Sequence, residues 1–215
     1  MNDLGALRET LFASPTEARL YGVAAGIVTN NQDPDGQGRV KVTCPWLSDT
    51  HESFWARVVT PMAGKDRGLY LLPEVDDEVL IAFEHGAPGV AYVLGSLWNG
   101  KDTPPETNGG GQNNHRSLTS RSGHVLRLDD TSGDERIEII DKSGANRMVI
   151  RTSTNSIAIE AAGNVEIRSK RGALTLSGRG IDITSTAGVT ITGTQTIDVK
   201  ANGPLTLQGA TIDLN

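Results

Sequence analysis

Cysteine, aromatic residues and long apolar runs are all scarce in this sequence. Cys44 is the only cysteine among 215 residues, so the chain cannot form an internal disulfide. No apolar stretch approaches the roughly 20 residues of a membrane span. The N-terminus also lacks the basic start and apolar run of a signal peptide. We therefore expect synthesis in the cytoplasm without a signal peptide.

An excess of positive charge is missing as well. The formal net charge is −6 and the isoelectric point is near 5.2. A chain that binds nucleic acid along its length needs clustered Lys and Arg to neutralise phosphates. No nucleic-acid partner is therefore expected.

The nine aromatic residues all precede position 99, and this uneven distribution divides the chain. Between the two parts lies a polar stretch with two prolines and three consecutive glycines, which is typical of a linker. The predicted organisation is an N-terminal arm (1–19), a barrel domain (20–100), a linker (101–116) and a repeat domain (117–215).

The arm carries Leu4, Leu7 and Leu11 at helical spacing, which predicts a short amphipathic helix over residues 2–13. The barrel domain contains five runs of strand-like composition, separated by Gly-, Asp- and Pro-containing turns. Five short strands of this kind favour a small closed β-barrel. The runs are residues 21–30, 38–46, 53–60, 77–85 and 91–98.

From Gly123 onward, short units recur in which apolar residues occupy every second position, such as VLRLD, RIEII, SIAIE and TIDVK. The later units repeat about every eight residues, which leaves room for one strand and one turn. One strand and one turn cannot close a coil, whereas three chains wound about a common axis can. We therefore expect a homotrimeric, intertwined triple-stranded β-helix. Its predicted core residues are Ile157, Ile159, Val165, Ile167, Leu174, Leu176, Ile181, Ile183, Val189, Ile191, Ile197, Val199, Leu205 and Leu207.

Residues 38–100 resemble the OB-fold domain of VgrG spikes, phage baseplate assembly protein V and the T4 tail spike. The resemblance rests on the RVKV strand, Pro45-Trp46, Phe83-Glu84-His85-Gly86 and the GSLWNG end at residues 95–100. Residues 122–146 also look like the start of this family's needle. The resemblance implies an all-β chain, an OB-fold barrel followed by the β-helical needle. It also implies the function: the trimeric, membrane-puncturing central spike of a contractile injection system, placed at the end of the inner tube in an injection particle or phage tail baseplate.

The same resemblance implies partners. Because few residues precede the barrel domain, a separate gp27-like hub protein is expected on the N-terminal side, with Leu4, Leu7 and Leu11 as candidate contacts. A PAAR-like tip protein is expected to cover Ile212, Leu214 and Asn215 at the C-terminal end, and effector cargo is a further possible partner. The linker is too short for a lysozyme domain, and no histidine follows His124, so neither a hydrolase nor a metal-bound tip is expected.

Catalysis has little support in the residues. Cys44, the acidic pair Asp129-Asp130 and Asp134 lack the neighbouring groups of a nucleophilic or glycosidase site. No catalytic residue, metal ligand or cofactor is therefore predicted, and we expect a structural protein rather than an enzyme. The alternative is an OB-fold module on a β-helical stalk that binds nucleic acid or oligosaccharide, with Trp46, Phe54 and Trp55 as stacking candidates.

Overall fold

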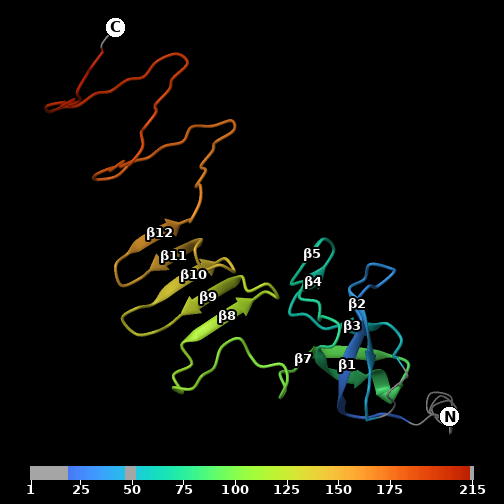
Figure 1. Cartoon of the computed structure of the whole chain (residues 1–215). Coiled ribbons are helices and arrows are strands. Elements are labelled where there is room, and N and C mark those ends of the chain that lie inside the picture. The colour runs from blue at the N-terminus through green and yellow to red at the C-terminus, as the bar shows by residue number, and fades with distance from the viewer. Residues whose placement is uncertain (1–18, 47–51, 214–215) are drawn as a thin grey trace, which may run out of the picture.

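The computed structural model describes residues 19–46 and 52–213 (Figure 1). The helix expected over residues 2–13, with Leu4, Leu7 and Leu11, lies outside the described residues. So do Leu214 and Asn215 at the other end. Apart from one 3-10 turn, η1 (Glu84–Gly86), the described residues form strands and irregular segments, which confirms the predicted all-β class. In the part described, no helix is long and apolar enough to cross a membrane.

The first unit is a closed barrel of five strands, as the five apolar runs predict. Neighbouring strands follow the order β1-β2-β3-β7-β6 and close through β1 with β6; all pairs are antiparallel except β3 with β7. The strands are β1 (Val23–Asn30), β2 (Arg39–Thr43), β3 (Ala56–Val58), β6 (Glu78–Phe83) and β7 (Ala91–Ser96).

Alternation of apolar and polar residues along these strands places small aliphatic side chains inside the barrel. The buried core consists of Val28, Val40, Val42, Ala56, Val79, Ile81, Ala91 and Val93, and Cys44 packs against it. At Gly26 on β1 the backbone passes so close to its neighbours that a Cβ would lie 2.3 Å from Cδ1 of Ile81. This glycine is therefore needed for packing rather than for an unusual dihedral angle.

A small hairpin, β4 (Ala63–Gly64) and β5 (Arg67–Gly68), projects from the barrel between β3 and β6. It was not predicted from the sequence. Figure 1 shows the hairpin on the side of the barrel that faces the second sheet.

The second unit is one antiparallel sheet of five strands in sequence order. Residues 101–114 connect it to the barrel, and the sheet begins at His115, inside the segment predicted as a linker. Four of its strands coincide with the first four apolar units of the repeat. The strands are β8 (His115–Thr119), β9 (Val125–Asp129), β10 (Arg136–Ile140), β11 (Arg147–Arg151) and β12 (Ser156–Glu160).

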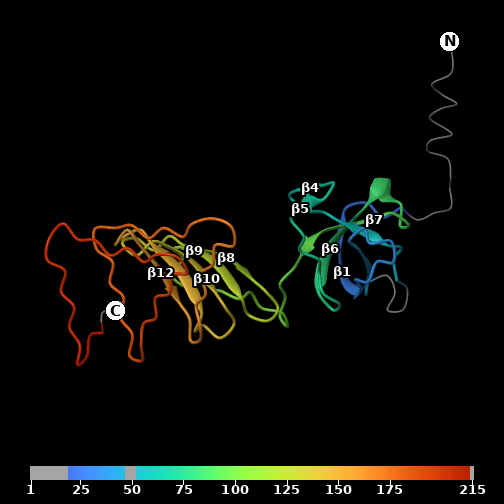
Figure 2. The ribbon, with the colours of Figure 1, turned by 90° about the horizontal axis from the view of Figure 1, so that it is seen from above.

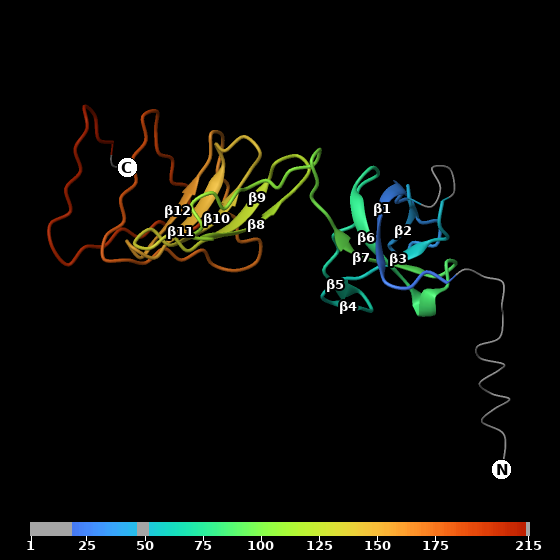
Figure 3. The same cartoon turned by 90° about the horizontal axis from the view of Figure 1, so that it is seen from below.

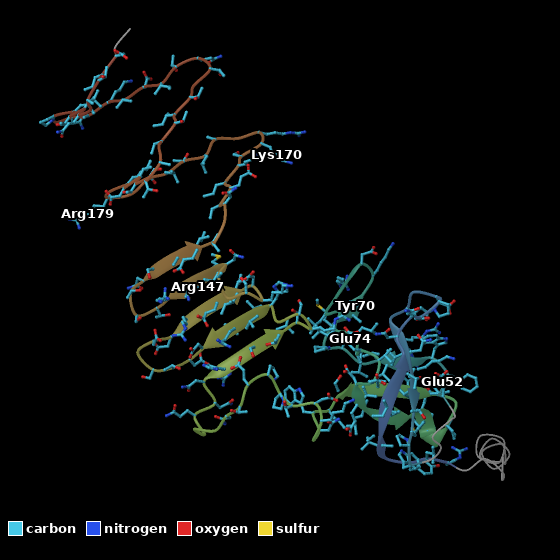
Figure 4. The ribbon with its side chains drawn as sticks, in the orientation of Figure 1. Glu52, Tyr70, Glu74, Arg147, Lys170 and Arg179 are labelled. Atoms are coloured by element: carbon cyan, nitrogen blue, oxygen red, sulfur yellow. The ribbon has the colours of Figure 1, made fainter. Side chains whose placement is uncertain are left out.

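Residues 161–213 continue beyond β12 as a chain that turns back and forth without forming strands (Figures 2 and 3). Every one of these residues is exposed. Lys170 and Arg179 extend outward from this part of the chain (Figure 4).

Candidate functional site

The two faces of the β8–β12 sheet differ sharply in chemistry. The strand register aligns side chains into rows that run across all five strands. One row on the first face reads Leu118, Leu126, Ile139, Met148 and Ile159. The neighbouring row on that face begins with Arg116 and continues through Leu128, Ile137, Ile150 and Ile157. Nine apolar side chains therefore share one face.

This aliphatic face has no covering layer among the described residues. Ile139, Ile157 and Ile159 are 55%, 64% and 61% exposed. A sheet needs a packed face to be stable in water, and a contiguous apolar patch marks an interaction surface. The aliphatic face is therefore the strongest candidate functional site of the chain.

The opposite face is polar and charged. Its central row runs from Ser117 through Arg127 and Glu138 to Val149 and Ala158. Oppositely charged side chains on neighbouring strands form three ion pairs, Arg127 with Glu138, Arg136 with Asp129 and Arg147 with Glu160, and Asp129 and Glu138 are buried. This face meets water or the connecting segment, and so the sheet is amphipathic.

The predicted trimer-core residues begin at Ile157 and continue down the tail. Ile157 and Ile159 lie on the aliphatic face of β12, as alternation predicts. All fourteen predicted side chains are 53% to 72% exposed in the single chain. The aliphatic residues of the tail, residues 161–213, are thus left uncovered in the single chain, like those of the sheet.

The predicted core residues, which begin at Ile157, did not include the earlier part of the aliphatic face. It comprises Leu118, Leu126, Leu128, Ile137, Ile139, Met148 and Ile150. The units VLRLD, RIEII and RMVIR carry the same alternation as the later ones. That alternation was the available signal for six of the seven residues, whereas Leu118 lies in the mostly polar strand HRSLT.

A second apolar surface lies on the barrel, beside the point where the described chain begins at Arg19. Tyr21, Val23, Trp46 and Phe83 line a groove of about 420 Å³ there. Tyr21 is 76% exposed and Trp46 is 54% exposed. The groove therefore offers a docking surface on the N-terminal side of the barrel.

The residues considered for catalysis are separated in the structure or have structural roles. Burial raises the pKa of the Cys44 thiol, which makes it a poorer nucleophile. Asp129 accepts hydrogen bonds from the amide and hydroxyl of Thr131 and pairs with Arg136. Within residues 19–46 and 52–213, no group of three or more His, Cys, Asp or Glu side chains is arranged to hold a metal ion.

Of the aromatic stacking candidates, Trp55 lies beside cations that are already paired, whereas Trp46 and Phe54 are 54% and 75% exposed. Arg39 and Lys41 lie over the ring of Trp55, at 6.0 and 5.5 Å from its centroid. Arg39 also pairs with Asp33 at 2.6 Å, and Lys41 pairs with Glu52 at 3.2 Å. Because Arg39 and Lys41 already pair with carboxylates, they are poorly available to bind phosphate groups.

Comparison with known proteins identifies the barrel. Residues 24–98 match the type VI secretion system/phage-baseplate injector OB domain. This match confirms that the closed barrel is an OB domain, as the resemblance implied.

Curated relatives extend the similarity beyond the barrel. The type VI secretion system spike protein VgrG1a of Pseudomonas aeruginosa is 28% identical over 134 residues, which cover 57% of this chain and 21% of the relative. VgrG1c of the same organism is 29% identical over 127 residues, covering 56% and 17%, and VgrG4b is 30% identical over 145 residues, covering 60% and 18%.

Over rather more than half of its length, this chain is therefore similar to VgrG spike proteins, and its barrel matches the OB domain of type VI secretion and phage-baseplate injectors. It spans only about a fifth of the length of the relatives it matches.

Proposed function

We propose that the chain is the central spike of a contractile injection system and that it acts as a homotrimer. The observation that carries the proposal is the uncovered aliphatic face of the five-stranded sheet, together with the exposed aliphatic residues that recur along the tail. The injector OB domain in front of it, and the similarity to type VI secretion spike proteins, support the same role.

Three copies of the chain can cover the aliphatic face and pair the tail backbone, which a single chain leaves exposed. Three sheets that turn their aliphatic faces inward would enclose a dry axis, and their charged faces would meet water. Each buried Ile or Leu stabilises such an assembly by about 1.5–3 kcal/mol. The backbone groups of residues 161–213 would pair with strands from sister chains, which gives the intertwined triple-stranded β-helix.

The work of such a spike is mechanical rather than catalytic. A rod that punctures a membrane must transmit axial force without separating, and three interlocked chains resist separation because strand pairing links each chain to the other two. The chain needs no cofactor for this role.

The barrel groove and the end of the tail are proposed contact sites for other components. The groove lined by Tyr21, Val23 and Trp46 suits an apolar segment of a hub protein on the N-terminal side of the barrel. At the other end, a PAAR-like tip protein would cover Ile212, whose side chain is 49% exposed. This contact is proposed from the family resemblance.

Mass determination by light scattering on the purified full chain tests the proposal. We expect a mass of three chains at micromolar concentration and a trimer band that persists in SDS without boiling. A stable monomer would remove the basis of the spike proposal. Oligonucleotide binding at micromolar concentration that weakens with salt would instead favour the nucleic-acid alternative.

A further inference from the structure

Residues 101–114, which connect the barrel to the sheet, have a defined path that is fixed at both ends. The Asn99 carboxamide oxygen accepts hydrogen bonds from the amides of Lys101 and Asp102. At the far end, the amide of Asp130 donates to the carbonyl of Asn114 at 2.9 Å. We call residues 101–114 the strap.

A closed ring of six side chains joins the middle of the strap to the charged face of the sheet. Glu106 is the only member that comes from the strap. His115, Asp129 and Arg127 come from β8 and β9, and Arg136 and Glu138 from β10. The contacts around the ring are Glu106 to His115 at 2.5 Å, His115 to Asp129 at 3.5 Å, Asp129 to Arg136 at 2.8 Å, Arg136 to Glu138 at 3.1 Å, Glu138 to Arg127 at 3.4 Å and Arg127 to Glu106 at 3.1 Å.

Five of the six side chains in the ring are at most 25% exposed, and the sixth, His115, is 43% exposed. The side chains of Asp129 and Glu138 are 2% and 9% exposed, and those of Glu106 and Arg127 are 22% and 24% exposed. Water screens such groups much less than it screens surface ion pairs. Removing one member leaves its neighbours with uncompensated charge, which is the costly way to break a buried pair.

Apolar packing contributes little to holding the strap in place. A cavity of about 460 Å³ lies beside the strap, lined by Trp98, Pro105, Asn108, Asn113 and Ser117 among others. Trp98 is 71% exposed, so its indole does not pack firmly beneath the strap. Attachment therefore depends on polar contacts, and Glu106 makes the contacts to the interior of the sheet.

We propose that this ring is a lock that holds the strap on the charged face of the sheet, which under the proposed function is the outer face of the needle, and thereby sets the angle between barrel and needle. The direct ion pair between the two units, Arg121 with Glu74, has side chains that are 81% and 48% exposed. Such an exposed pair contributes little. The lock makes the joint stiff, so that a load on the barrel reaches the sheet at Glu106 as well as through the backbone.

Hydrogen–deuterium exchange on the full chain in its native oligomeric state tests the lock. Glu106→Gln keeps the side-chain shape and removes the charge. The matched control is Glu160→Gln, which removes a half-exposed carboxylate that pairs with Arg147 at 2.7 Å on the same sheet, outside the ring. We expect amides of the strap to exchange about tenfold faster or more in Glu106→Gln, with β10 and the control unchanged.

Three outcomes would overturn the proposal. Strap exchange could be unchanged in Glu106→Gln, exchange in β10 could rise as much as exchange in the strap, or strap exchange could rise equally in Glu160→Gln. Glu106→Asp keeps the charge and shortens its reach, and it should give an intermediate rate if the lock depends on contact with Arg127. Small-angle scattering should show a broader distribution of barrel-to-needle distances in Glu106→Gln. An unchanged distribution with a released strap would refute the stiff joint.

Discussion

Two neighbouring residues of β12 allow a matched test of the aliphatic face. Ser156 and Ile157 are consecutive, so their side chains point to opposite faces of the sheet. Both are exposed in the single chain, and the Ile157 side chain is 64% exposed. A substitution at either position should therefore leave a monomer almost unaffected. Substitutions at the two positions should differ in effect only in an assembly that buries the aliphatic face.

The expected magnitude follows from the exposed fraction of Ile157. Full burial of an isoleucine is worth about 1.5–3 kcal/mol, so burial of the exposed 64% contributes about 1–2 kcal/mol per chain. Three chains contribute about 3–6 kcal/mol, which Ile157→Ala would largely remove. The trimer dissociation constant should rise by a factor of about 10² to 10⁴. Ile157→Asp, which places three carboxylates near a common axis, should prevent assembly.

The assay is mass by light scattering as a function of protein concentration. We expect wild type and Ser156→Asp to remain trimeric at concentrations where Ile157→Asp is monomeric. Equal assembly of the two Asp variants would refute the assignment of the aliphatic face to the trimer axis.

Three further predictions concern packing and ionisation. Gly26→Ala forces a Cβ to within 2.3 Å of Cδ1 of Ile81 and should destabilise the barrel by about 1–3 kcal/mol in urea unfolding, whereas Gly95→Ala meets no atom within 4 Å and should match wild type. Burial raises the pKa of Cys44, so its thiol should react with a disulfide reagent near pH 8 more slowly than free cysteine does; an equal rate would contradict this. Hydrogen bonding by Ser117 and the ring partners His115 and Arg127 lowers the pKa of Glu106, so its contribution to stability is complete above the pKa of an unfolded glutamate, about 4.3, and is lost as the pH falls below it. The unfolding midpoint should therefore fall more for wild type than for Glu106→Gln between about pH 5 and about pH 3, and parallel curves would contradict this.

Alternation of apolar and polar residues carried most of the information about the fold. The five runs between residues 21 and 98 correspond to the five barrel strands, and units such as VLRLD and RIEII coincide with β9 and β10. In both cases one side of each strand must avoid water, and this constraint leaves a period of two in the sequence.

The strands that the sequence did not predict are those in which neither side, or only a single residue, must avoid water. Strands β4 and β5 are two residues each and exposed, so their sequence need not alternate. Strand β8 reads HRSLT and carries a single aliphatic residue, Leu118. The sequence does not predict the lock, because its members are up to 32 positions apart, from Glu106 to Glu138. Strand register brings five of them together, and the path of the strap adds Glu106.

The intertwined β-helix of the tail remains a prediction for a different reason. Residues 161–213 have the strongest repeat of the chain, yet they form no strands in the single-chain structure. Under the proposed function their hydrogen-bond partners belong to sister chains. In the single chain the aliphatic residues of the tail are exposed, because the strands that would cover them belong to the other two chains.

Electron cryo-microscopy of the purified full chain tests the central claim most directly. The account predicts three chains about one axis, with residues 161–213 in strands that pair between chains and with Ile181 and Ile183 turned inward. A tail whose strands pair within one polypeptide, or an aliphatic face left open to solvent in a stable monomer, would contradict it.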